Sequence, residues 1–270
     1  MTVRIEKNGF VTTIINDRIN ARNACDPETS YALHQAFLDF EADEGARVAV
    51  FWGAGGAFCA GWDLKSASDL EDPERFESDI VEGLRIPDGD EPWTRGPMGP
   101  TRLQLTKPVI AAIEGPAVAG GMELALWCDM RVMAENAYFG VYCRRWGVPL
   151  IDGGTVRLPR LVGVGRALDI VLTGRKVPAE EAHRIGLCER VVRPGEARAA
   201  AEVMAQEIAR FPQGAVRADR LGVYASHGLP TEEALRREWA GGLEALRTEG
   251  LAGAARFASG LGRSGDFERI

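Results

Sequence analysis

The sequence has little of what metal sites, disulfide frameworks and membrane spans require. Its three histidines lie far apart and form no H-E-x-x-H motif, which disfavours a metal site built on local spacing. Its five cysteines include no C-x-x-C pair, a pattern typical of reduced thiols in a cytosolic protein. The most apolar stretch, 109–128, is interrupted by Glu114, Pro116 and Glu123, so no membrane span is expected. The N-terminus lacks the apolar run of a signal peptide.

An excess of positive charge is also absent. The chain has 32 Lys and Arg against 39 Asp and Glu, a formal net charge of −7. A general nucleic-acid binder needs a basic footprint, so a nucleic-acid partner is not expected. With 270 residues, of which 46% are hydrophobic, the chain is long enough for one large domain, alone or with a small appendage. A core of that size needs no disulfide or metal to hold it together.

Short apolar runs alternate with helical patterns along most of the chain. Strand patterns occupy 2–7, 10–15, 48–52, 109–113, 130–134 and 187–193. Helical spacing occupies 27–43, 120–127, 165–173 and 178–185, and then nearly everything from about 196 onward. Strands alternating with helices, followed by a helical tail, predict an α/β core with an α-helical C-terminal appendage. Residues 66–100 are acidic and rich in proline, which predicts a surface segment with one or two short helices.

Two glycine-containing segments, 53–65 and 113–125, each follow a predicted strand and lead into a predicted helix. Taken singly, such glycines often serve only tight turns and close packing. Together, two segments of this kind could direct two backbone N–H groups at one carbonyl oxygen and form an oxyanion hole. Helical spacing places the Glu123 carboxylate near the same face as the Gly120 N–H. A carboxylate there could transfer a proton at the carbon next to that carbonyl, whereas the alternative is an ordinary surface glutamate.

These segments resemble the crotonase superfamily, that of the enoyl-CoA hydratases and isomerases. The resemblance runs through 21–24, 55–61, 63–65, 107–112, 120–125, 128–129, 153–155, 172–175 and 182–187. It implies a crotonase-like spiral of β-β-α turns over residues 1–200. It also implies that 201–270 form an α-helical C-terminal trimerisation region, giving homotrimers or dimers of trimers.

The resemblance also implies roles for individual residues. The backbone N–H groups of Trp62 and Gly120 would form the oxyanion hole. The surface for coenzyme A would comprise Arg22, Ala24, Ala60, Asp63, Leu64 and Lys65. Cations suit that anionic ligand, although an exposed cation is the alternative for Arg22 and Lys65. Trp62 stands where many relatives have a small residue, so its indole is expected to narrow or shape the acyl pocket.

The resemblance places the two glutamates of the hydratases at Glu123 and at position 143, where this chain has Cys143. A neutral thiol cannot replace a carboxylate at neutral pH, so Cys143 is interpreted as structural. Asp152 is the candidate second acid, because related isomerases and a dehalogenase carry a catalytic aspartate near that position. The alternative for Asp152 is an N-cap for the helix beginning near Gly153.

The function expected from these residues is hydration of 2-enoyl-CoA thioesters through an enolate stabilised in an oxyanion hole. Double-bond isomerisation or another crotonase reaction is the alternative, because Cys143 replaces the usual second glutamate. A catalytically degraded CoA-binding or assembly protein is a third possibility, and the net charge disfavours RNA binding. The expected partner is a small acyl-CoA substrate, with no metal and no cofactor beyond the coenzyme A of that substrate. The expected location is the cytoplasm.

Overall fold

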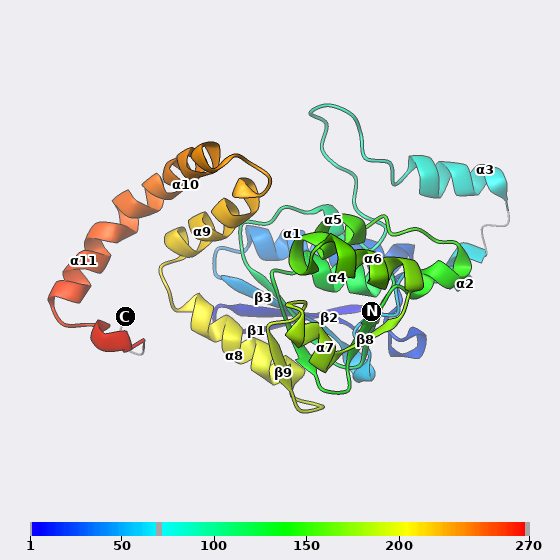
Figure 1. Ribbon diagram of the computed structural model, residues 1–270, viewed down its shortest axis with the longest axis horizontal. Coiled ribbons are helices and arrows are strands. Elements are labelled where there is room, and N and C mark those ends of the chain that lie inside the picture. The colour runs from blue at the N-terminus through cyan, green and yellow to red at the C-terminus, as the bar shows by residue number, and fades with distance from the viewer. Residues whose placement is uncertain (1, 69–71, 268–270) are drawn as a thin grey trace.

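The computed structural model describes residues 2–68 and 72–267 (Figure 1). Residues 69–71 of the predicted acidic segment and 268–270 of the predicted helical tail therefore lie outside the described residues, as does Met1. Within the described ranges, no helix combines the length and the apolar character needed to cross a bilayer.

The valine- and isoleucine-rich runs form a six-stranded sheet in the order β1-β2-β3-β4-β6-β9. Its strands are β1 (Val3–Asn8), β2 (Val11–Asn16), β3 (Val48–Gly53), β4 (Val109–Ile113), β6 (Met130–Ala134) and β9 (Arg190–Val192). The β1–β2 hairpin is antiparallel, and every later pairing is parallel. Because parallel strands are joined by crossovers, the segments following β3 and β4 both emerge at the carboxyl edge of the sheet.

A second sheet, not anticipated from the sequence, contains β5 (Pro116–Val118), β7 (Tyr138–Gly140) and β8 (Lys176–Pro178). These strands are only three residues long, which is too short for a period-2 pattern to be recognised. They turn the chain away from the main sheet after β4 and after β6. The pairing of β5 with β7 also fixes the residues immediately before the helix that carries Glu123.

Helices cover both faces of the main sheet (Figure 1). Ala49 and Phe51 of β3 face α1 (Pro27–Ala42), whereas Val48 and Val50 face α8 (Ala197–Ala209). All four side chains are fully buried. Burying a valine or phenylalanine side chain contributes about 1.5–3 kcal/mol, so this alternation specifies the register of β3. The expected domain boundary at 200 falls within α8, which packs on the sheet, and the division into two parts stays a prediction.

The remaining helices connect the strands or follow them at the C-terminus. They are α2 (Leu64–Ser68), α3 (Pro73–Phe76), α4 (Gly120–Trp127), α5 (Gly154–Val162), α6 (Val164–Thr173), α7 (Ala179–Arg184), α9 (Gln213–Ser226), α10 (Thr231–Ala245) and α11 (Leu251–Ala258). In Figure 1, α9 to α11 extend to one side of the core, while α3 projects on the opposite side. Arg220 of α9 pairs with Asp129 at 2.9 Å, and this ion pair ties α9 to the loop before β6.

Candidate active site

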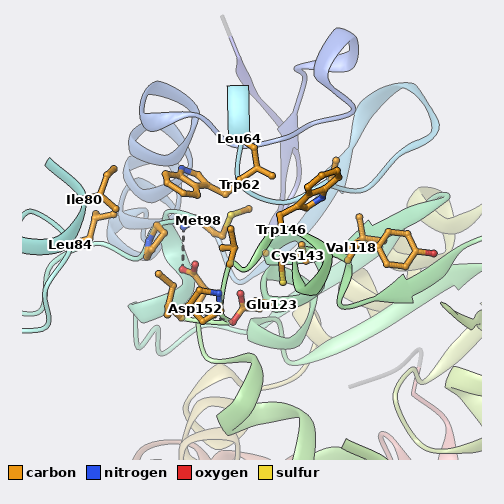
Figure 2. A pocket seen from close by; sticks show the side chains of 18 of the residues that line it. Trp62, Leu64, Ile80, Leu84, Met98, Val118, Glu123, Cys143, Trp146 and Asp152 are labelled. Carbon is orange, nitrogen blue, oxygen red and sulfur yellow. Dashed lines mark hydrogen bonds between the residues drawn. The ribbon is translucent and has the colours of Figure 1, made fainter. Parts of the chain in front are cut away.

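A cavity of about 970 Å³ opens between α4, the loop before α5 and the segment that contains α3 (Figure 2). Ile80 and Leu84 lie on one side of it, and Cys143 and Trp146 lie on the other. The lining is mostly apolar, with Glu123 and Asp152 as its carboxylates among the described residues. An apolar cavity with a few converging ionisable groups is the usual form of a small-molecule site.

Glu123, in the first turn of α4, is 3% exposed. Its Oε1 accepts hydrogen bonds from the backbone N–H groups of Asp152 at 2.9 Å and Gly154 at 2.8 Å. Its Oε2 has no hydrogen-bond partner within the described part of the chain and is available to a ligand. Burial and the nearby Asp152 carboxylate raise the pKa of Glu123 to about 7. A carboxylate with such a pKa can gain or lose a proton near neutral pH.

Asp152 brings a second carboxylate to the same cavity (Figure 2). Its Oδ1 accepts hydrogen bonds from the Met98 backbone N–H at 3.1 Å and from the Thr101 hydroxyl. The N-cap of α5 is Gly153, and no side chain caps that helix end, so the alternative of Asp152 as an N-cap is wrong. Burial raises the pKa of Asp152 against the opposing effect of these hydrogen bonds.

The two glycine segments lie side by side, as the sequence predicts. The Cys59 carbonyl accepts a hydrogen bond from the Val118 N–H at 3.0 Å. A β-carbon at Gly61 would lie 3.1 Å from the Gly120 nitrogen, so the residues before Trp62 approach the start of α4 closely. Within the described residues, the backbone N–H groups of Trp62 and Gly120 donate to no other protein group. Two unpaired amides, one at a helix N-terminus, can bind an oxygen that carries negative charge.

The backbone immediately before Gly120 is strained. Ala119 has φ +53° and ψ −126°, a conformation that a residue with a β-carbon adopts only at an energetic cost. The Ala119 N–H donates to the Gly140 carbonyl at 2.8 Å, so the pairing of β5 with β7 holds the strained residue in place. The small second sheet thus sets the direction of the Gly120 amide.

The predicted coenzyme A residues divide into two groups. Arg22, Ala60 and Leu64 line the cavity together with Trp62 and Gly120. Ala24, Asp63 and Lys65 do not line it, as far as the structure describes the chain. Asp63 forms an ion pair with Arg18 at 2.5 Å, and the Lys65 backbone N–H donates to Asp63 at 3.0 Å. The contact of all six residues with coenzyme A stays a prediction.

Cys143 lies in the cavity wall and is 7% exposed. Burial, followed by the charge of Glu123, raises the pKa of its thiol. A thiol with a raised pKa stays protonated near neutral pH and offers an uncharged surface rather than a second base. Among the described residues, no group of three or more His, Cys, Asp or Glu is placed to hold a metal ion.

Several residues that organise the site carry no recognisable sequence signal. Met98, Thr101 and Arg157 contact Asp152 through its carboxylate or its backbone, and Arg18 holds Asp63. Met98 and Thr101 lie within or just after the proline-rich segment, about fifty positions before their partner. Only Arg157, one turn into the helix after Gly153-Gly154, occupies a position that local spacing could have suggested.

Comparison with known proteins identifies relatives in the superfamily that the sequence motifs resemble. Residues 6–236 match the enoyl-CoA hydratase/isomerase family. The carnitinyl-CoA dehydratase of Salmonella typhi is 38% identical over 237 residues, which cover 87% of this chain and 85% of the relative. An enoyl-CoA hydratase from Mycobacterium tuberculosis H37Rv has a similar structure, with a TM-score of 0.84, 32% identity and coverage of 96% of each chain. The enoyl-CoA hydratase of Bacillus anthracis follows with a TM-score of 0.83, 29% identity and coverage of 96% of each chain.

The chain therefore belongs to the enoyl-CoA hydratase/isomerase family. Its crotonase-like fold is confirmed by these structural neighbours. Membership supports hydratase-type chemistry on an acyl-CoA thioester, the class of reaction expected from the glycine segments and Glu123.

Proposed function

We propose that this protein adds water across the α,β double bond of a 2-enoyl-CoA thioester. The observation that carries the proposal is the pair of buried carboxylates, Glu123 and Asp152, beside the two unpaired amides of Trp62 and Gly120 in one cavity. The thioester oxygen would accept from both amides, which together form an oxyanion hole. Removing one such donor typically costs about 2.7–4 kcal/mol in the barrier, so the two amides are a major source of catalysis.

The two carboxylates have environments that suit different tasks. The Oε1 atom of Glu123 already accepts two amide hydrogen bonds, which favour the ionised form and leave Oε2 to remove a proton from water. The water oxygen bonds to the β-carbon, and the electron pair of the double bond moves into the thioester to give an enolate. In this proposal Asp152 carries the second proton and donates it to the α-carbon, and burial raises the pKa of Asp152, which favours its protonated form. At the end of the reaction Glu123 is protonated and Asp152 is ionised. The cycle closes when Glu123 loses its proton and Asp152 gains one.

Double-bond isomerisation is the second candidate, and the observation that favours it is the protonated thiol of Cys143 at the position of the usual second glutamate. One carboxylate could then carry a proton from the γ-carbon to the α-carbon without adding water. The same cavity and amides would serve this reaction.

A substrate panel read by mass spectrometry tests the function directly. We expect purified protein to add 18 mass units to crotonyl-CoA or a longer 2-enoyl-CoA, because water becomes part of the product. Deuterium exchange at the α-carbon without that gain would favour the isomerase. Binding of the thioesters with turnover of none would contradict both enzymes and leave a CoA-binding protein.

We also propose that the chain assembles into a homotrimer, or a dimer of trimers, through its C-terminal helices. Trp239 of α10 is 66% exposed and Leu251 of α11 is 79% exposed, although both are large apolar side chains. Covering such side chains contributes about 1.5–3 kcal/mol each, and the family resemblance supplies the number of three subunits. Sedimentation equilibrium should give three or six times the chain mass, and a monomer at micromolar concentration would contradict the proposal.

A cytoplasmic location completes the proposal. All five cysteines are buried and unpaired, as expected for a protein kept in a reducing compartment. No cofactor is assigned, because coenzyme A would enter as part of the substrate thioester.

A further inference from the structure

The Arg157 guanidinium joins two segments that lie far apart in the sequence. Its Nη1 donates to the Asp152 carbonyl at 2.9 Å, and its Nη2 donates to the Thr101 carbonyl at 2.7 Å. The two amino groups are held in one plane, so a single side chain fixes the spacing between these two carbonyls. Within the described part of the chain Arg157 forms no ion pair, and its hydrogen-bond partners are these two carbonyls.

Each residue clamped through its carbonyl uses another of its groups to hold a carboxylate of the site. The Thr101 hydroxyl donates to the Asp152 carboxylate. The Asp152 backbone N–H donates to the Glu123 carboxylate at 2.9 Å. The guanidinium therefore holds the two residues whose own hydrogen bonds orient the Asp152 and Glu123 carboxylates.

The local backbone is shaped to admit the guanidinium. Gly153 has φ +92°, and a β-carbon there would lie 2.1 Å from Nη1 of Arg157. The next residue, Gly154, donates its N–H to Glu123 at 2.8 Å. The turn of 152–154 is thus held between Arg157 on one side and Glu123 on the other, and glycine at 153 permits both contacts.

Two of the four groups whose charges act on Arg157 are the carboxylates of the site. The groups that interact with it electrostatically are Glu123 of α4, Asp152 before α5, Cys128 after α4 and Tyr224 of α9. Arginine keeps its positive charge at ordinary pH, and the charge of Arg157 lowers the pKa of both carboxylates.

We propose that Arg157 is a positioning residue that sets the separation and orientation of the Glu123 and Asp152 carboxylates for hydration. This inference rests on the proposed function, because it assigns Arg157 to the same two groups. The clamp acts on carbonyls, and Arg157 does not line the cavity as far as the structure describes the chain. We therefore expect its loss to change how the carboxylates meet the double bond rather than how tightly the thioester binds.

Three variants separate the charge of Arg157 from its two-point geometry. Arg157→Gln removes both, Arg157→Lys keeps the charge on a single nitrogen, and Arg160→Gln, on the exposed face of the same helix, is the matched control. We expect Arg157→Gln to lower kcat about 100-fold, the size of effect that a displacement of about 1 Å produces, with KM within about twofold. Arg160→Gln should match the unmodified protein.

The pH profile provides a readout that a merely structural arginine would not move. Since the Arg157 charge lowers the pKa of Glu123, its removal should shift the acidic limb of kcat/KM to higher pH. Arg157→Lys should restore the position of that limb while kcat stays reduced. An unshifted limb with kcat within twofold of the unmodified protein in folded Arg157→Gln would overturn the proposal. A loss of butyryl-CoA affinity in proportion to kcat would do the same.

Two further measurements keep the test decisive. If Arg157→Gln does not fold, Thr101→Val removes the hydroxyl contact to Asp152 and should lower kcat about tenfold without raising KM. Unchanged kinetics in that variant would contradict the clamp. The ¹³C-carboxyl titration of Glu123 needs no turnover. A raised Glu123 pKa in Arg157→Gln, with the pKa of the unmodified protein kept in Arg157→Lys, therefore supports the proposal even if the substrate panel rejects hydration.

Discussion

Glu123→Gln is expected to lower kcat for hydration about 10⁴-fold while KM for the thioester stays within about threefold. Glutamine has nearly the same shape, and its oxygen can still accept from the Asp152 and Gly154 amides at the positions now 2.9 and 2.8 Å from Oε1. The fold and the cavity should therefore survive. What is lost is the atom that takes the proton from water, because an amide cannot act as a base.

In the unmodified protein, the ionisation of Glu123 should determine how kcat/KM depends on pH. The pKa of Glu123 is raised to about 7, and the proposed base must be ionised. The kcat/KM of hydration should therefore rise as the pH increases through about 7, and this limb should be absent from any residual activity of Glu123→Gln. Activity that falls above pH 7 would instead make Glu123 the proton donor.

Glu135→Gln is the matched control, because this exposed glutamate lies outside the cavity. Full activity in purified, folded Glu123→Gln would remove Glu123 from the mechanism and leave the two amides and Asp152 as the proposed catalytic groups.

Asp152→Asn is expected to lower kcat about 100-fold with little change in thermal stability. The asparagine oxygen can accept from the Met98 N–H and the Thr101 hydroxyl as Oδ1 does now, so the packing is kept. The start of α5 does not depend on this side chain, because Gly153 is the N-cap. The amide cannot release a proton to the α-carbon, and the rate falls for that reason.

The solvent deuterium isotope effect distinguishes this role of Asp152 from a structural one. With Asp152→Asn, proton delivery to the α-carbon should become the slow step, and the solvent deuterium isotope effect on hydration should increase. Asp219→Asn, an exposed aspartate on α9, is the control. A variant that loses stability but keeps its rate and isotope effect would show that Asp152 only supports the fold.

The long elements and the first carboxylate could be predicted because their signals are local. Strand β4 and helix α4 have the expected bounds, since an unbroken apolar run and helical spacing are properties of consecutive residues. The short strands of the second sheet could not be predicted, because three residues carry no period and their pairing depends on partners elsewhere. Likewise, the sequence alone does not distinguish a catalytic Asp152 from an N-cap, because an aspartate just before a helix is suited to either role.

Two properties of this protein follow from its sequence alone: the α/β class, and the placement of Glu123 one helical turn after Gly120 in a glycine segment that follows a strand. The tertiary structure decided which groups surround that glutamate. It brought Asp152 and Cys143 to the same cavity, directed Met98 and Thr101 at Asp152, and clamped the turn with Arg157. These contacts join residues separated by roughly 5 to 56 positions. The pKa of Glu123 is raised by burial and by the charge of Asp152, which lies 29 positions away. Helical and strand periods describe neighbours along the chain, whereas burial and charge at a site depend on neighbours in space.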